Sequence, residues 1–73
     1  MSGKIEIILN GKATEVVQES TVRSLVEDLG LQAGQVAVEL NGEIVSRDHW
    51  PEKRLVPGDK IEVVHFVGGG SGA

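Results

Sequence analysis

The sequence contains no cysteine, two prolines and only 3% aromatic residues among its 73 positions. The absence of cysteine excludes a disulfide framework, a thiolate nucleophile and a metal site with cysteine ligands. No apolar run approaches the ~18 residues of a membrane span. The segment Met1-Ser2-Gly3-Lys4 carries a single lysine and does not resemble a signal peptide. We therefore expect a cytoplasmic protein.

Charge and length restrict the kinds of function further. The chain has 7 Lys and Arg residues against 11 Asp and Glu residues, a formal net charge of −4, which would repel a phosphate backbone and argues against nucleic acid as a partner. A single domain this short buries only about 60% of its unfolded surface. An enclosed active-site cavity is therefore not expected, and any chemistry is predicted at an edge, a surface or a terminus.

Glycine marks a boundary near the C-terminus, because four of the ten glycines fall within residues 68–73. Side chains no larger than serine cannot bury enough apolar area to offset the entropy of ordering. We predict a folded domain over residues 1–67 and a flexible Gly-rich tail over residues 68–73.

Alternating apolar residues and two Asn-Gly pairs predict most of a sheet. Residues 4–17 are typical of a hairpin that turns at Asn10-Gly11. Residues 35–40 are typical of a third strand, and its turn at Asn41-Gly42 leads into Glu43-Ile44-Val45. The last strand, residues 61–67, is apolar on both faces, which predicts a central position or a face offered to a partner. Placing it beside the N-terminal hairpin at the centre of the sheet would satisfy both patterns.

One helix is expected between the hairpin and the third strand, capped by Ser20 or Thr21 and closed by Gly30. The loop over residues 46–59 is predicted to be irregular and anchored by Trp50. Together the elements indicate an α+β fold in which one helix packs on one face of a small mixed sheet. The apolar face of the helix is formed by Val22, Leu25, Val26 and Leu29.

The polar residues give no pattern typical of an enzyme. His49 lies in the irregular loop and His65 in the last strand, so we interpret them as a loop imidazole and a half-buried strand imidazole rather than as metal ligands or acid-base groups. No serine is interpreted as a nucleophile activated by a histidine and a carboxylate. We predict a protein that is not an enzyme and binds no metal or cofactor itself.

The glycines after the last strand offer a different chemistry. A segment without Cβ atoms has the smallest cross-section and can thread a narrow channel, so Gly68, Gly69 and Gly70 could present a terminal carboxylate to the active site of another enzyme. The alternative is a disordered terminus or a Gly-Ser linker.

Nearly the whole chain resembles the ThiS family of sulfur carriers in thiamine biosynthesis, which are ubiquitin-like β-grasp proteins. The resemblance runs through Leu9-Asn10-Gly11 and the helix start at Thr21-Val22, and continues in the loop segment Ile44-Val45-Ser46-Arg47-Asp48-His49-Trp50. Its most specific part is the segment from Pro57-Gly58-Asp59 to His65-Phe66-Val67-Gly68-Gly69-Gly70.

The resemblance implies a β-grasp fold and a carrier mechanism. An E1-like activating enzyme would use ATP and Mg²⁺ to adenylate the terminal glycine carboxylate. A persulfide sulfur donor would displace AMP, and the thiocarboxylate would be delivered to a thiazole synthase. The reactive carboxylate is assigned to Gly70, with Gly69 as the nearest alternative.

The end of the chain departs from the family pattern, because Ser71-Gly72-Ala73 follow the glycines. An internal Gly70 carries an amide and cannot be adenylated, so we expect either trimming by a protease or that these three residues are an addition. Docking of partners is predicted at Val64, Phe66 and Val67, since exposed apolar residues beside a functional tail are natural contacts. The alternative is that Phe66 packs beneath the loop.

Three other functions fit the same pattern. The chain could carry sulfur for molybdopterin or amino-acid biosynthesis, it could be a ubiquitin-like modifier joined to protein lysines, or it could be a non-covalent interaction module.

Overall fold

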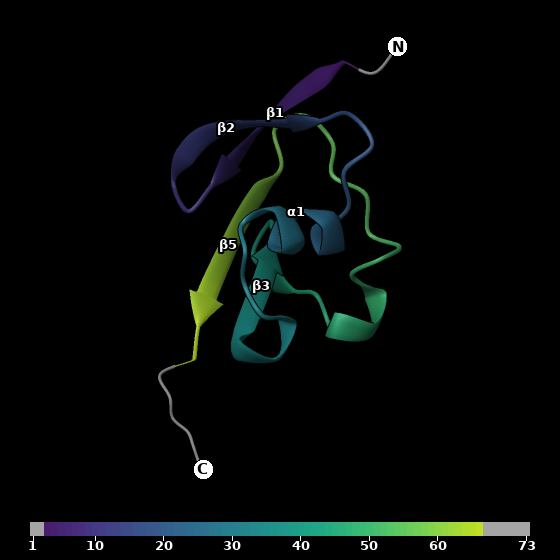
Figure 1. Cartoon of the computed structure of the whole chain (residues 1–73). Helices are drawn as coiled ribbons and strands as arrows, with labels where there is room; N and C mark the ends of the chain where they lie inside the picture. Colours follow the sequence, from purple (N-terminus) through teal and green to yellow (C-terminus); the bar gives the residue numbers. More distant parts are fainter. Residues whose placement is uncertain (1–2, 67–73) are drawn as a thin grey trace.

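In the computed structural model, which describes residues 3–66, the chain forms a five-stranded mixed sheet with one α-helix packed on one face (Figure 1). The strand order across the sheet is β2-β1-β5-β3-β4. The strands are β1 (Lys4–Leu9), β2 (Lys12–Val17), β3 (Val36–Leu40), β4 (Glu43–Ile44) and β5 (Lys60–His65). The helix is α1 (Val22–Asp28), and two short 3₁₀ helices are η1 (Ala33–Gln35) and η2 (Arg47–His49).

Both predicted Asn-Gly turns are present. Asn10 and Gly11 have φ values of 50° and 83°, and Asn41 and Gly42 have 53° and 88°. Two successive positive φ values are typical of the type I′ turn, whose twist matches that of the flanking strands. The turns join β1 to β2 and β3 to β4 in antiparallel pairs. This confirms the predicted N-terminal hairpin and the third strand with its turn, while β4 is a fifth strand that the alternation did not predict.

Strand β5 is central, as its two apolar faces predict. It pairs in parallel with β1, where Leu9 lies opposite Ile61, and antiparallel with β3, where Val36 lies opposite His65. The prediction that the whole N-terminal hairpin lies at the centre is wrong for β2, which forms an edge of the sheet. Since β1 pairs with β5 on one side and β2 on the other, β2 is left with a single neighbour.

The helix ends are fixed by local hydrogen bonds. Thr21 is the N-cap: its side chain accepts from the backbone N–H of Ser24, and the Ser24 hydroxyl accepts from the N–H of Thr21. Ser20, the other expected cap, does not cap the helix; it is buried just before the helix begins. At the other end Gly30, with φ 74°, and Leu31 donate to the carbonyls of residues 27 and 26, which is a Schellman motif.

A single cluster of buried side chains joins the helix, the sheet and the loop. The predicted helix face contributes except for Leu29, which is 42% exposed because it is the C-cap, at the periphery of the helix. Trp50 is 3% exposed and its Nε1 donates to the Val45 carbonyl at 2.9 Å, which confirms it as the loop anchor. The cluster consists of Ile7, Val22, Leu25, Val26, Val36, Val38, Leu40, Trp50, Leu55 and Ile61.

Within residues 3–66, no helix is both long enough and apolar enough to span a bilayer.

Candidate functional site

The end of β5 is the point from which the chain continues toward the glycines. Strand β5 is flanked by β1 and β3, and just beyond it the Phe66 N–H donates to the Gln35 carbonyl at 2.9 Å. The antiparallel pairing of β5 with β3 and the hydrogen bond from Phe66 to Gln35 hold the end of β5 in place. Figure 1 shows β5 and β3 in the sheet. The predicted site residues Val67 and Gly68–Gly70 lie outside the described residues.

Apolar side chains are exposed on the sheet face opposite the helix. Val64 is 53% exposed and Phe66 is 59% exposed. Val64 lies opposite Ala37 of β3. On the neighbouring strand β4, Ile44 is 71% exposed. We name the residues Ala37, Ile44, Val64 and Phe66 the outer apolar patch; the predicted docking role of Val64 and Phe66 stays a prediction.

A small hollow borders the patch, and its lining shows where the Phe66 side chain lies. Phe66 lines a hollow of about 180 Å³ together with Ala33, Ile44, Arg47 and Trp50. Its ring therefore adjoins the loop, yet more than half of the residue is exposed. Phe66 is consequently not one of the core residues, and the alternative in which it packs beneath the loop is not what the structure shows.

Acidic side chains face one another at two places on the outer face of the sheet, and only the pair Glu39 and Glu62 adjoins the outer apolar patch. Glu39 and Glu62 are directly opposite each other on β3 and β5, and Glu6 and Glu15 on β1 and β2. Like charges directly opposite each other on a sheet destabilise it. Lys60 lines one hollow together with Glu39 and Glu62, so a basic group of this chain already lies near that pair.

Sequence reasoning did not single out Ile44 as a surface residue. It was expected only as part of the segment after the Asn41-Gly42 turn, and the pairing of Ile44 with Glu39 puts it on the outer face of β4, next to β3. The sequence also did not predict that Glu39 and Glu62 lie opposite each other, because that position depends on the register of β3 and β5. The signal available in the sequence was an apolar residue two positions after the Asn41-Gly42 turn.

The two histidines, His49 and His65, lie in different parts of the structure, one on the loop and one on β5. The ring Nδ1 of His49 is 3.0 Å from the Ser46 hydroxyl on the exposed loop. His65 was expected to be half-buried, which is wrong: it is exposed, because burial decreases along β5 from Ile61 through Val63 toward the end of the strand. Across residues 3–66, no group of three or more His, Cys, Asp and Glu side chains is arranged to hold a metal ion.

Comparison with known proteins gives a consistent family. The model described as the ThiS family matches residues 7–70. The sulfur carrier protein ThiS of Bacillus subtilis is 40% identical over 63 residues, which are 85% of this chain and 96% of that protein. The thiazole synthase of Paramagnetospirillum magneticum is 37% identical over 67 residues, which are 92% of this chain and 21% of the synthase. The chain thus spans about a fifth of the length of that synthase.

A solved structure shares the architecture. The crystal structure of the thiamine biosynthesis protein ThiS from Geobacter metallireducens matches with a TM-score of 0.78 at 35% identity, covering 90% of this chain and all of that one. The five-stranded mixed sheet with one helix is therefore a β-grasp fold, which confirms the predicted α+β fold class.

Proposed function

Because the chain belongs to the ThiS family, we propose that it is a sulfur carrier for thiazole formation in thiamine biosynthesis. The family resemblance predicted from the sequence is confirmed by the family match and by the Bacillus subtilis relative. That relative, almost all of which this chain covers, is named a carrier protein. This agrees with the prediction that the chain is not itself an enzyme.

The observation that carries the proposal is the extent of the family match, which runs to residue 70 and so includes Gly68–Gly70. In the proposed mechanism these glycines thread the channel of a partner, and the carboxylate of Gly70, or of Gly69, is the reacting group. The folded domain supplies the docking surface. The exposure of Val64 and Phe66, four and two residues before Gly68, supports this division of roles.

The proposed chemistry uses ATP because a carboxylate is a poor electrophile. The glycine carboxylate attacks the α-phosphate of Mg-ATP in an E1-like enzyme, which releases pyrophosphate and forms an acyl-adenylate. The terminal sulfur of a persulfide donor then attacks the acyl carbon and AMP leaves. A thiol cleaves the resulting sulfur–sulfur bond by forming a disulfide, which leaves the thiocarboxylate on the glycine.

A free carboxylate on Gly70 requires that the peptide bond to Ser71 be broken. We therefore include a trimming protease among the proposed partners. The proposed acceptor is a thiazole synthase, since a protein of that name contains a segment similar to this chain. The proposed compartment is the cytoplasm, where ATP is at hand and where the cysteine-free sequence needs no oxidising conditions.

The proposal is tested with two forms of the chain, one that ends at Gly70 and one that ends at Ala73. Each is incubated with an E1-like enzyme of thiamine biosynthesis, Mg-ATP, a persulfide donor and a thiol. We expect pyrophosphate release and a mass change of one oxygen replaced by sulfur only in the form that ends at Gly70. The control is the Gly70→Ala variant of that form, which keeps a terminal carboxylate but adds a Cβ atom to the residue that carries it.

The outcomes separate the competing functions. A thiocarboxylate that restores thiazole formation by a thiazole synthase supports the carrier. A thiocarboxylate accepted only by a molybdopterin or amino-acid pathway would reassign the acceptor. Isopeptide-linked species in cells would indicate a protein modifier. Absence of activation in both forms, with the fold intact, would contradict the proposal and leave a non-covalent interaction module.

A further inference from the structure

A groove lies on the helix side of the molecule, between α1 and the segment that begins with η2. Its volume is about 430 Å³. Apolar atoms of Val26, Leu31 and Pro51 line it, and Trp50 forms part of its wall. Val26 and Trp50 are buried elements of the core, so this wall of the groove is rigidly placed. The charged residues that line the groove are Arg23, Arg47 and Glu27.

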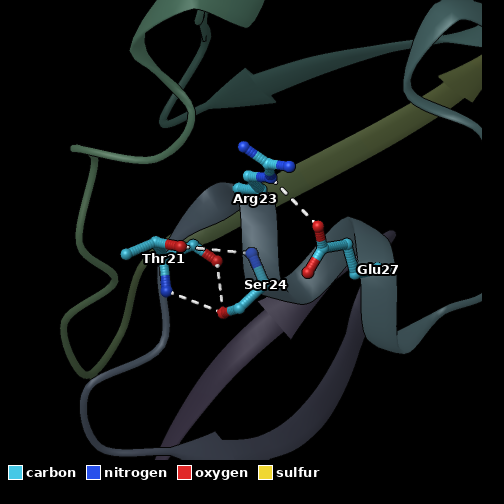
Figure 2. A network of polar contacts seen from close by, with 4 residues as sticks. All are labelled: Thr21, Arg23, Ser24 and Glu27. Carbon is cyan, nitrogen blue, oxygen red and sulfur yellow. Dashed lines mark hydrogen bonds and ion pairs between the residues drawn. The ribbon is translucent and has the colours of Figure 1, made fainter.

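Arg23 uses only one of its guanidinium nitrogens to contact an acidic side chain. Arg23 and Glu27 form an i,i+4 ion pair on the exposed surface of α1, in which Arg23 Nε lies 2.9 Å from Glu27 Oε2. Figure 2 shows this single contact, and the two terminal nitrogens of the guanidinium are not joined to the carboxylate. Arginine has five N–H donors, so the terminal ones can still bind an oxygen of another molecule.

The second arginine has no acidic partner within residues 3–66, since no carboxylate of that region lies within 4.0 Å of the Arg47 guanidinium. Its Nη1 lies where a side chain on Gly34 would be, 3.4 Å from the position of a Cβ there. The guanidinium is therefore close to η1 and beside the groove. Two of the three arginines of a chain with a net charge of −4 thus line one apolar groove.

We propose that this groove binds an acidic peptide segment of a partner protein, with an aspartate or glutamate next to an aliphatic side chain. A guanidinium binds a carboxylate with two parallel hydrogen bonds, which gives direction as well as affinity. The aliphatic side chain would pack against Val26, Leu31 and Pro51. A simple inorganic anion would satisfy the arginines but leave these apolar residues in water, so a peptide fits the whole surface better.

The groove shares no lining residue with the outer apolar patch, although Ala33, Arg47 and Trp50 line both the groove and the hollow beside Phe66. Val64 belongs to the sheet face opposite the helix and lines no part of the groove, whereas the groove is formed by α1 and the loop. A peptide in the groove would leave Val64 exposed for another partner. The inference therefore does not rest on the proposed sulfur-carrier function and can fail or succeed independently of it.

The test is selection from a displayed library of random peptides on the folded domain. The wild-type domain is compared with the double variant Arg23→Gln/Arg47→Gln, which removes both guanidinium groups while keeping side-chain length. Arg54→Gln is the matched control, because Arg54 is exposed and lies outside the groove. Binding of one selected peptide, synthesised alone, is then followed by the NMR signal of the Trp50 indole N–H.

We expect the selected peptides to share an acidic residue beside an aliphatic one. The synthesised peptide should shift the Trp50 signal, bind at least roughly tenfold more weakly to the double variant and bind the Arg54→Gln variant normally. Peptides without acidic residues, equal binding to the double variant, or shifts confined to Val64 and its neighbours would overturn the proposal. If inorganic phosphate shifts the Trp50 signal as strongly as the peptide does, the site is a general anion site and the peptide assignment is wrong.

Discussion

The carboxylate of Asp59 shows how one residue joins two turns. It is 8% exposed and accepts hydrogen bonds from the Val56 backbone N–H at 2.9 Å and from Asn41 Nδ2 at 3.0 Å. Asn41 in turn accepts from the Lys60 N–H at 3.0 Å. The turn before β5 is thus tied to the turn between β3 and β4, which positions the start of the strand that leads toward the proposed reacting glycines.

Replacing Asp59 by alanine should lower the free energy of unfolding by about 2–4 kcal/mol, because two donors lose a charged acceptor in a nearly buried place. Urea unfolding followed by Trp50 fluorescence measures the change. The control is Glu62→Ala on the exposed outer face, where a change within about 0.5 kcal/mol is expected. Equal effects of the two substitutions would show that the Asp59 hydrogen bonds do not stabilise the fold.

Substitution of Phe66 should change the affinity for a partner without changing the free energy of unfolding much. Since it is 59% exposed, Phe66→Ala should leave the free energy of unfolding within about 1 kcal/mol. If Phe66 is a central contact, the same change should weaken binding to the E1-like enzyme by about 2 kcal/mol or more. Calorimetric titration measures the affinity.

The matched control for Phe66 is His65→Ala, which removes an exposed ring from the neighbouring position on the other side of the strand. We expect that variant to bind the enzyme as the wild type does. Unfolding of the Phe66→Ala variant would mark Phe66 as a core residue and contradict its docking role.

Among the elements, α1 depends most on its ends. A helix of seven residues is too short to be stable in isolation, and it keeps its place through the buried face of Val22, Leu25 and Val26. The reciprocal hydrogen bonds of Thr21 and Ser24 satisfy donors that the first turn would otherwise leave free (Figure 2).

Thr21→Ala should therefore destabilise the domain by about 1 kcal/mol. Ser24→Ala removes the other half of the same capping box, so the double variant should cost less than the sum of the single changes. Thermal and urea unfolding of the three variants measure this coupling. Strict additivity would show that the two side chains act independently.

At the scale of the whole molecule, the core is small and β5 runs through its centre. Ile61 is fully buried between the neighbouring strands β1 and β3, beneath the helix-covered face. Native domains have only about 0.05–0.15 kcal/mol of stability per residue. One core residue therefore accounts for a substantial share of the stability of a 73-residue chain.

Ile61→Val should cost about 0.5–1.5 kcal/mol and Ile61→Ala about 2–5 kcal/mol. Ile44→Val is the matched control, since it is the same chemical change at a residue that is 71% exposed. Denaturant unfolding compares the three variants. A cost at Ile44 equal to that at Ile61 would mean that the outer face contributes to the folding core.

The sequence by itself determined the N-terminal hairpin, the second Asn-Gly turn and the helix, because each depends on neighbours along the chain. It indicated the central place of β5 only indirectly, through the two apolar faces of that strand. Asn-Gly adopts two successive positive φ values, and apolar spacing selects the buried face of α1. The family resemblance likewise rests on contiguous motifs. The Gly-rich tail and the reacting glycines are predictions of the same kind, and they lie outside the described residues.

Only the tertiary structure decided which distant residues meet. It placed β2 at an edge, Glu39 opposite Glu62, and Arg23 and Arg47 on one groove. It also gave Asn10 a second role, since its side chain accepts from the Val63 N–H at 2.8 Å. Strand register and packing bring such groups together through contacts between elements, and no local pattern in the sequence encodes those distances.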